Sequence, residues 1–216
     1  MSGSCEDLVR AVRAAGIRDG RVLEAVRATP RAGFVPAGWV GAAYEDMPVP
    51  IGHGQVTTQP SLLARMIEAL GPGGDEHVLE VGTGLGFQTA LLARLAGDVV
   101  SVELWADLTE EARGNLAALG IGNVELRTGD GGEGVPDLAP FDAVIVSAAF
   151  PEVPPPLVEQ LRLGGRLVQP IGPGGQEDVV LFRRTAAGLA PLRVLTPACF
   201  VRLHGRYGFP SDDTDA

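Results

Sequence analysis

Ten consecutive residues, IGHGQVTTQP at positions 51–60, carry a histidine, two amides and two adjacent hydroxyls between glycines and a proline. Such groups in one irregular segment can form a wall that binds a polar substrate. They also permit a structural interpretation, in which Thr58 caps the following helix by accepting a hydrogen bond from a backbone N–H. From these residues alone the cap is the favoured interpretation for Thr58, and a structural role is favoured for His53. Both roles of Thr58 can hold together.

A second candidate segment, VLEVGTGLGFQTA, places glycines at 82, 84 and 86 between an apolar strand and a helix. Glycines at such a junction allow a tight turn and let a ligand approach the backbone closely. The dinucleotide pattern G-x-G-x-x-G would need its last glycine where Phe87 stands, so the segment is less suited to binding the pyrophosphate of a dinucleotide. A purely structural glycine-rich turn remains the alternative.

Acidic residues follow the glycines at useful positions. Glu103 ends the next strand about 20 residues after Gly82, where a carboxylate can accept from both ribose hydroxyls. Asp130, in GDGGEG after the third strand, can accept from an adenine amino group, and Glu80 can lie near a cationic ligand or support the helix start. The alternatives are a solvated glutamate at Glu103 and an Asp-Gly turn at Asp130. An adenosine ligand without pyrophosphate suits S-adenosylmethionine and favours a methyltransferase over a dehydrogenase.

Composition narrows the possible partners. The net charge is −10 and the pI about 4.7, which disfavours nucleic acid and anionic membranes as partners. All 17 basic residues are arginines, so neither a Schiff-base lysine nor a P-loop lysine is available. The three histidines and two cysteines lack metal-ligand spacing, and we expect no metal site. With neither a signal peptide nor a membrane span, a reduced, cytoplasmic monomer is expected, and a Cys5–Cys199 disulfide is a minor alternative.

Strands and helices alternate through the middle of the chain, which predicts βαβ units in one α/β domain with a doubly wound, mostly parallel sheet. Expected helices are 5–16, 19–30, 60–70, 87–96, 106–119 and 154–163. Expected strands are 78–81, 98–103, 124–128, 142–147 and 165–171, followed by antiparallel edge strands at 177–184, 188–197 and 198–203. We divide the single domain into an N-terminal helical and substrate-side part (1–59), a cofactor-binding core (60–171), C-terminal strands (172–208) and a disordered tail (209–216).

Several of these segments together resemble the protein-L-isoaspartate O-methyltransferases, which repair damaged aspartyl and asparaginyl sites. The similarity covers roughly residues 20–208. The segments that carry it are ATPRAGFVP, AYEDMPVPIGHGQVTTQP, VLEVGTGLGFQTALLARL, GDGGEGVPDLAPFDAVIVSAAFPEVPPPLVEQLRLGGRLVQPIG and ACFVRLHGRYGF. The 51–60 stretch is more specific to the family than the glycine loop.

The resemblance implies a class I methyltransferase (Rossmann-like) fold, S-adenosyl-L-methionine as donor and L-isoaspartyl residues in proteins or peptides as acceptor. It implies methylation of the α-carboxylate, which starts repair through a succinimide. The family's signature hydroxyl falls on Thr58, which we take as catalytic. The remaining site residues that we expect are Glu80, Gly82, Thr83, Gly84, Gly86, Gln88, Glu103, Leu104, Asp130 and Gly131 for the cofactor, and His53, Gln55, Thr57, Thr58 and Gln59 for the substrate.

The chain departs from the family pattern at several positions. In the signature, Val56 replaces a threonine, Thr57 an apolar residue and Thr58 a serine. Phe87 replaces a common tyrosine, and Arg202 stands where proline is usual. Because Val56, Thr57 and Arg202 fall on substrate-facing segments, acceptor preference is open. The rivals are an aspartyl methyltransferase that forms an aspartimide in a dedicated precursor peptide, a small-molecule carboxyl methyltransferase, and a non-catalytic adenosine-binding module.

Overall fold

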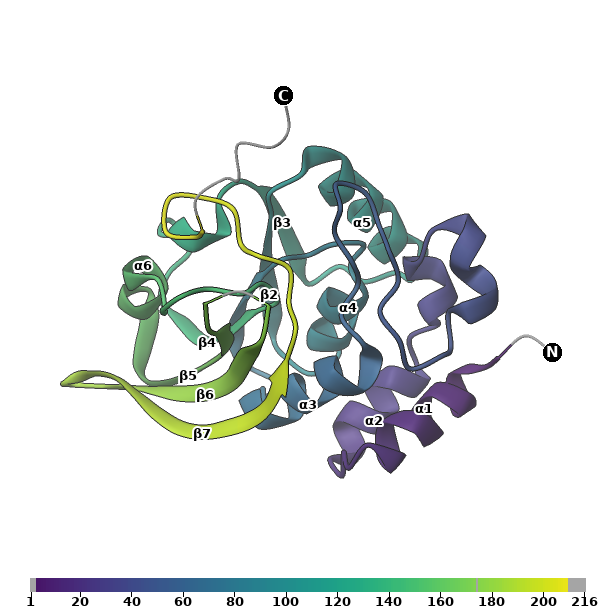
Figure 1. Ribbon diagram of the computed structural model, residues 1–216, viewed down its shortest axis with the longest axis horizontal. Helices are drawn as coiled ribbons and strands as arrows, with labels where there is room; N and C mark the ends of the chain where they lie inside the picture. Colours follow the sequence, from purple (N-terminus) through teal and green to yellow (C-terminus); the bar gives the residue numbers. More distant parts are fainter. Residues whose placement is uncertain (1–2, 174, 210–216) are drawn as a thin grey trace.

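One sheet of seven strands organises the part of the chain that the computed structural model describes, residues 3–173 and 175–209 (Figure 1). The strand order is β3-β2-β1-β4-β5-β6-β7; the pairs from β3 to β5 are parallel, and β6 and β7 are antiparallel. The strands are β1 (His77–Val81), β2 (Asp98–Glu103), β3 (Val124–Thr128), β4 (Phe141–Val146), β5 (Leu161–Ile171), β6 (Glu177–Thr185) and β7 (Gly188–Ala198). The predicted doubly wound sheet with an antiparallel edge is confirmed.

Helices connect the parallel strands and precede them in the chain. The α-helices are α1 (Cys5–Ala14), α2 (Gly20–Arg27), α3 (Pro60–Leu70), α4 (Phe87–Ala93), α5 (Ala106–Ala118) and α6 (Pro155–Glu159), and the 3₁₀ helices are η1 (Arg31–Phe34), η2 (Ala37–Ala42) and η3 (Gly131–Glu133). The predicted end of α3 is confirmed, because Gly71 caps it in the left-handed conformation with φ 59°. Figure 1 shows α1 and α2 (purple) at one end of the molecule and the β6–β7 hairpin at the other.

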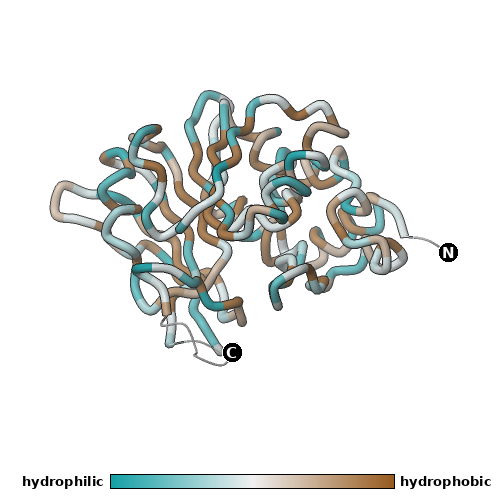
Figure 2. The backbone as a smooth tube through the Cα atoms, turned by 90° about the horizontal axis from the view of Figure 1, so that it is seen from above, coloured by the Kyte–Doolittle hydropathy of each residue, from teal (hydrophilic) through white to brown (hydrophobic). Residues whose placement is uncertain are grey.

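The sheet separates two apolar layers. On one face, alternate strand residues such as Val78 and Ile145 pack against the helical side chains of α1 to α4. On the other face, Leu79 and Val144 join a second cluster with Leu157 of α6. Figure 2 shows the hydrophobic stretches concentrated in the strands at the centre of the molecule. This alternation explains why the short apolar strands could be recognised from sequence.

Several predicted boundaries differ by two to four residues, as at the end of α4 and the start of β5, and two predicted elements differ more. The helix expected over 154–163 ends at Glu159, because Leu161 already pairs with Phe141 of β4 in the sheet. Sheet pairing therefore overrides the helical pattern of this segment. The strand expected over 198–203 is also wrong: β7 ends at Ala198, and the backbone of Arg202 forms an isolated β-bridge with Ala149 instead of continuing a strand. Gly205 and Gly208 follow closely, and the segment crosses the sheet end instead of extending its edge.

Three further observations bear on the expectations. Within residues 3–173 and 175–209, no helix combines the length and the apolar character needed to cross a bilayer. Cys5 and Cys199 are both free thiols. Apart from Phe209, the tail expected over 209–216 lies outside the described residues.

The strand order also fixes where a ligand can bind. The chain runs outward from β1 through β2 to β3 and then returns to the other side of β1 as β4. The carboxyl ends of β1 and β4 therefore form the switch point of the sheet, where the following loops diverge and leave a crevice. The glycine turn follows β1 directly at this point.

Candidate active site

A central cleft lies at the switch point, with the glycine turn as its floor. Gly82, Gly84 and Gly86 all have positive φ, of 94°, 53° and 92°, which side-chain-bearing residues rarely adopt. A Cβ at Gly84 would lie 3.6 Å from Ile51 Cδ1, an ordinary contact distance, so the backbone conformation and not close packing favours glycine there. Gly82 and Gly84 line the cleft together with Thr83, Gln88 and Leu104, and their contact with a cofactor stays a prediction. Gly86 lies behind the turn, against α5.

The carboxylate of Glu103 lies in the same cleft, at the carboxyl end of β2. Its Oε2 accepts from the Gly84 N–H at 2.8 Å, and its Oε1 accepts from the Trp105 N–H at 3.2 Å. The side chain is buried and fixed on the glycine turn rather than solvated as a free strand end. A fixed acceptor pair at this place is the geometry that a ribose diol requires.

Glu80 lies beneath the glycine turn and does not line the cleft. Its side chain is completely buried, and its Oε2 accepts from the hydroxyls of Thr89 at 2.5 Å and Ser101 at 2.6 Å. Burial raises the pKa of Glu80 to about 7, although the hydroxyls of Ser101 and Thr89 act in the opposite direction. Because Thr89 belongs to α4, Glu80 ties β1 to the start of that helix.

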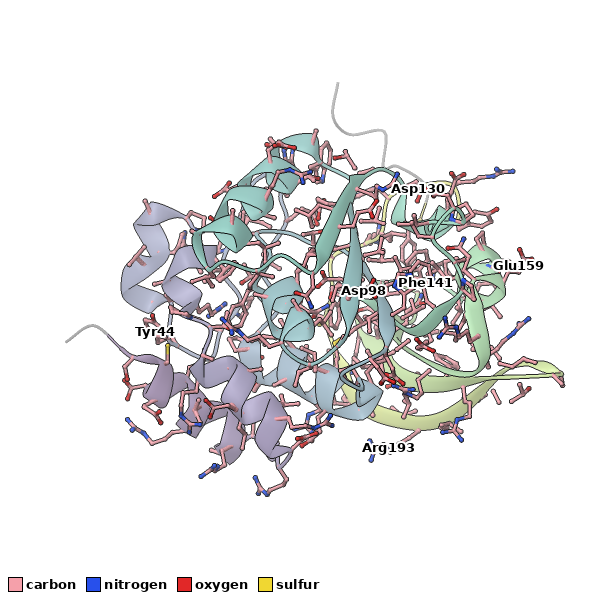
Figure 3. The ribbon with its side chains drawn as sticks, turned by 180° about the vertical axis from the view of Figure 1, so that it is seen from behind. Tyr44, Asp98, Asp130, Phe141, Glu159 and Arg193 are labelled. Atoms are coloured by element: carbon pink, nitrogen blue, oxygen red, sulfur yellow. The ribbon has the colours of Figure 1, made fainter. Side chains whose placement is uncertain are left out.

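The Asp-Gly pair after β3 is divided between two environments. Gly131 lines the cleft, but the Asp130 carboxylate accepts from the Gly132 N–H at 2.8 Å and from the Arg206 N–H at 2.7 Å. Figure 3 shows Asp130 at one end of the sheet, beside the pale yellow C-terminal segment. The Asp130 side chain therefore joins this turn to the C-terminal segment, and its contact with adenine stays a prediction.

The 51–60 segment forms the wall of the cleft. Gln55, Thr57 and Thr58 line it, whereas Gln59 lines an adjoining pocket described below. The cap interpretation of Thr58 is wrong, because the N-cap of α3 is Gln59, and the Ser61 N–H instead donates to Asp46 Oδ1 at 2.8 Å. The Thr58 hydroxyl makes no hydrogen bond to another residue of the described chain.

His53 lies at the rim and lines neither cavity. Its ring stacks on Trp105 with centroids 4.0 Å apart and planes 2° apart, and its Nε2 lies 2.8 Å from Asp107 Oδ2. The hydrogen bond with His53 lowers the pKa of Asp107. This His–Asp pair was not recognisable from spacing, since the two residues are 54 positions apart. It joins the wall to the start of α5.

The adjoining pocket, of about 390 Å³, shares part of the wall with the central cleft. We call it the side pocket; it lies between the first turns of α3 and the residues that end β7. Five residues border both cavities, namely Val56, Thr57, Thr58, Ser147 and Val201. Arg65 is the charged residue that lines the side pocket, and its Nη2 donates to the Ala15 carbonyl at 2.6 Å. Thr58 therefore lies on a partition between two cavities.

Sequence reasoning missed some residues of this site. Ser147 borders both cavities and donates to Gln88 Oε1 at 3.1 Å. Its position directly after a parallel strand at the switch point was a usable signal. Arg31 and Asp46, which hold the wall from behind, gave no signal because their partners lie in irregular segments. Among the described residues, no group of three or more His, Cys, Asp and Glu side chains could hold a metal ion.

The sheet order, the glycine turn at the switch point and the fixed acid after β2 define a Rossmann-like class I methyltransferase. A solved structure described as a protein-L-isoaspartate O-methyltransferase has a TM-score of 0.83 and 31% identity, covering 94% of this chain and 67% of that chain. A second, from Plasmodium falciparum and described as a putative enzyme of this kind in complex with S-adenosyl-L-homocysteine, has a TM-score of 0.79 and 23% identity, covering 94% and 99%. That second likeness supports the fold.

Sequence comparison narrows the class to a family. A family model described as Protein-L-isoaspartate(D-aspartate) O-methyltransferase (PCMT) matches residues 3–208. The protein-L-isoaspartate O-methyltransferase of Anaeromyxobacter dehalogenans (strain 2CP-C) is 53% identical over 190 residues, covering 87% of this chain and 91% of that protein. The corresponding protein of Methanoculleus marisnigri is 48% identical over 202 residues, covering 93% and 91%. The chain belongs to the protein-L-isoaspartate O-methyltransferase family.

Proposed function

We propose that this protein transfers the methyl group of S-adenosyl-L-methionine to the α-carboxylate of L-isoaspartyl residues in damaged proteins or peptides. The observation that carries the proposal is the partition at Thr58, which separates a cleft suited to an adenosyl ligand from a second pocket. Methyl transfer needs donor and acceptor on opposite sides of one small opening. Membership of the family supplies the class of acceptor.

The residues of the central cleft fit the donor. Gly82 and Gly84 place no side chain at two positions of the floor, and Glu103 offers two carboxylate oxygens to a ribose diol. Gln88 lines the cleft beside the turn, where its Oε1 accepts from the Ser147 hydroxyl at 3.1 Å. S-adenosyl-L-methionine supplies an electrophilic methyl group when it is bound. We assign Glu103, Gly82, Gly84, Thr83, Gln88, Leu104 and Gly131 to holding it.

The side pocket fits a carboxylate acceptor. A carboxylate is ionised at neutral pH, with a reference pKa near 4, so it needs no general base to react. The His53–Asp107 pair lines neither cavity and is not needed for this chemistry. In a chain of net charge −10, Arg65 supplies a local positive charge in the pocket that favours an anionic group.

The wall residues then act by position. The Thr58 hydroxyl, which bonds to no other described residue, is available to donate to the acceptor carboxylate at the partition. Val56 and Val201 flank the same opening and exclude water from it. Orientation and exclusion of water of this kind can lower a barrier by several kcal/mol. His53, Gln55 and Gln59 shape the peptide-facing surface of the wall in this proposal, and Thr57 borders both cavities beside Thr58.

The proposal is tested with a matched pair of peptides that differ only in an isoaspartyl or aspartyl linkage. Labelled methyl transfer should occur on the isoaspartyl peptide, and Thr58→Ala should lower kcat/KM while Thr58→Ser retains most of it. Transfer to the aspartyl peptide instead would favour a precursor-peptide aspartyl methyltransferase. Binding of S-adenosyl-L-homocysteine without transfer to either peptide would refute the enzyme assignment.

We further propose that the protein works as a cytoplasmic monomer, without nucleic-acid or membrane partners. The strongly negative net charge supports the absence of nucleic-acid and anionic-membrane partners, because a polyanionic partner would be repelled. Sedimentation at micromolar concentration tests the oligomeric state, and a dimeric mass would contradict it.

A further inference from the structure

A buried arginine lies behind the wall that carries Thr58. Arg31 of η1 has no exposed surface, yet no carboxylate forms an ion pair with it among the described residues. Its Nη1 donates to the carbonyls of Ala43 at 3.1 Å and Glu45 at 3.0 Å, and its Nη2 donates to the Met47 carbonyl at 3.0 Å. The fourth bond runs from Nη2 to the Thr57 hydroxyl, also at 3.0 Å. Four donated bonds therefore connect one side chain to residues 43–47 and to the wall at Thr57.

These bonds hold a segment that has little regular structure of its own. Residues 43–49 follow a 3₁₀ helix and form no strand of the sheet, so few backbone hydrogen bonds fix them. Thr57 completes the connection, because its hydroxyl accepts from the Val49 N–H at 3.0 Å and its own N–H donates to the Val49 carbonyl at 2.8 Å. The Arg31 guanidinium thus reaches the residue directly before Thr58.

The same guanidinium also contacts the cofactor side of the site. Its Cζ lies 5.8 Å from the ring centroid of Phe87, the first residue of α4 after the glycine turn. Phe87 lines the central cleft. Burial lowers the pKa of Arg31 to about 10, so the group stays charged at neutral pH and keeps all its donors.

We infer that Arg31, acting through the Thr57 hydroxyl, is a positioning residue that sets the place of Thr58 relative to the glycine turn. In this chain Thr57 replaces the apolar residue of the resembled signature, and its hydroxyl is turned toward Arg31 and Val49. In this inference the Thr57 hydroxyl fixes the wall, because it gives the Arg31 guanidinium a hydrogen-bond acceptor that an apolar residue would lack. The inference rests on the proposed function, because it assigns Thr58 to the partition where transfer takes place.

Three variants test this inference in the full-length protein. Thr57→Val removes the hydroxyl but keeps the side-chain shape, Thr57→Ser keeps the hydroxyl, and Arg31→Lys keeps the charge but loses the forked donors. Arg166→Lys is the matched control, because Arg166 also donates to carbonyls, at Leu70 and Gly71, and lies outside both cavities. Each variant is compared for kcat and KM on the isoaspartyl peptide, for the Kd of S-adenosyl-L-homocysteine and for Tm.

A misplacement of about 1 Å can cost about 100-fold in rate, so we expect Arg31→Lys to lower kcat by about 10- to 100-fold. Thr57→Val should lower kcat by roughly 5- to 20-fold, and Thr57→Ser should restore most of it. KM and the Kd of S-adenosyl-L-homocysteine should change by less than about threefold in each. The double variant Arg31→Lys/Thr57→Val should lose no more kcat than Arg31→Lys alone. Both substitutions break the same hydrogen-bonded connection, so their effects should not add.

The inference is overturned if Thr57→Val keeps kcat within twofold, or if Arg166→Lys loses kcat equally at the same fall in Tm. If Arg31→Lys does not fold, Thr57→Val decides by itself. Hydrogen exchange gives a readout independent of catalysis: the Val49 amide should exchange faster in Thr57→Val and not in Thr57→Ser. Absence of transfer by the wild-type protein would refute the proposed function, whereas unchanged exchange would refute the role of Arg31 and Thr57.

Discussion

Replacement of Glu80 by glutamine should change how the stability of this protein depends on pH. Glu80 is fully buried under the glycine turn, and burial raises its pKa from 4.5 to about 7. One carboxylate oxygen accepts from the hydroxyls of Ser101 and Thr89, and these hydroxyls and Gln88 act against the rise in pKa that burial causes. The protonated form of Glu80 is therefore favoured more in the folded protein than in the unfolded chain.

The size and sign of the effect follow from linkage. The difference between 4.5 and about 7 corresponds to about 3 kcal/mol at 1.36 kcal/mol per pKa unit. Because the folded-state pKa is raised, this stabilisation is complete below pH 4.5 and is lost as the pH rises through about 7. Glu80→Gln removes this titration and keeps a neutral side chain of nearly the same shape.

Urea unfolding of both proteins at several values between pH 4.5 and 8 measures the effect. We expect the free energy of unfolding of Glu80→Gln relative to wild type to rise by about 3 kcal/mol between the two ends of this range. The m-value should be unchanged, which would confirm that the same folded state is compared. A difference between the two proteins that is independent of pH would refute the reasoning.

Three other substitutions test the site. Glu103→Ala should raise the Kd of S-adenosyl-L-homocysteine by about 10- to 100-fold in calorimetry, because charge-assisted hydrogen bonds contribute about 1.5–3 kcal/mol each, and an unchanged Kd would contradict its role. Gly131→Ala should lower the free energy of unfolding by about 1–3 kcal/mol, because its Cβ would collide with Val81 Cγ1; wild-type stability in chemical denaturation would argue against that contact. Arg65→Gln should raise KM for the isoaspartyl peptide by about 3- to 10-fold at nearly constant kcat, and equal effects on a neutral control peptide would rule out charge recognition.

Much of the fold could be predicted because local patterns coincide with the final structure. Apolar strands bounded by glycine and polar turns, helices with apolar side chains every three to four residues, and the left-handed cap at Gly71 are all set by nearby residues. The incorrect predictions concern segments whose conformation depends on pairing within the sheet and not on nearby residues. Leu161 lies in a predicted helix but pairs with β4, and residues 198–203 have a strand-like composition but form only an isolated bridge between Arg202 and Ala149.

The candidate site divides in the same way. The glycine turn and Glu103 could be assigned from spacing, since both lie where successive parallel strands end. The contact expected between Asp130 and adenine stays a prediction, and the structure adds that the Asp130 carboxylate accepts from the backbone N–H of Arg206, 76 residues away. No sequence pattern shows such a contact, because it depends on how the C-terminal segment crosses the end of the sheet.

The sequence by itself determined the strand-turn-helix unit that can bind an adenosyl group and the hydroxyl-rich segment that accompanies it. It did not determine the direction of the two neighbouring hydroxyls. Only the tertiary structure turns Thr57 toward buried Arg31 and leaves Thr58 on the partition between the two cavities. The physical reason is that the direction of each hydroxyl depends on groups distant in the sequence. The Thr57 hydroxyl accepts from the Arg31 guanidinium and the Val49 N–H, whereas the Thr58 hydroxyl bonds to no other described residue.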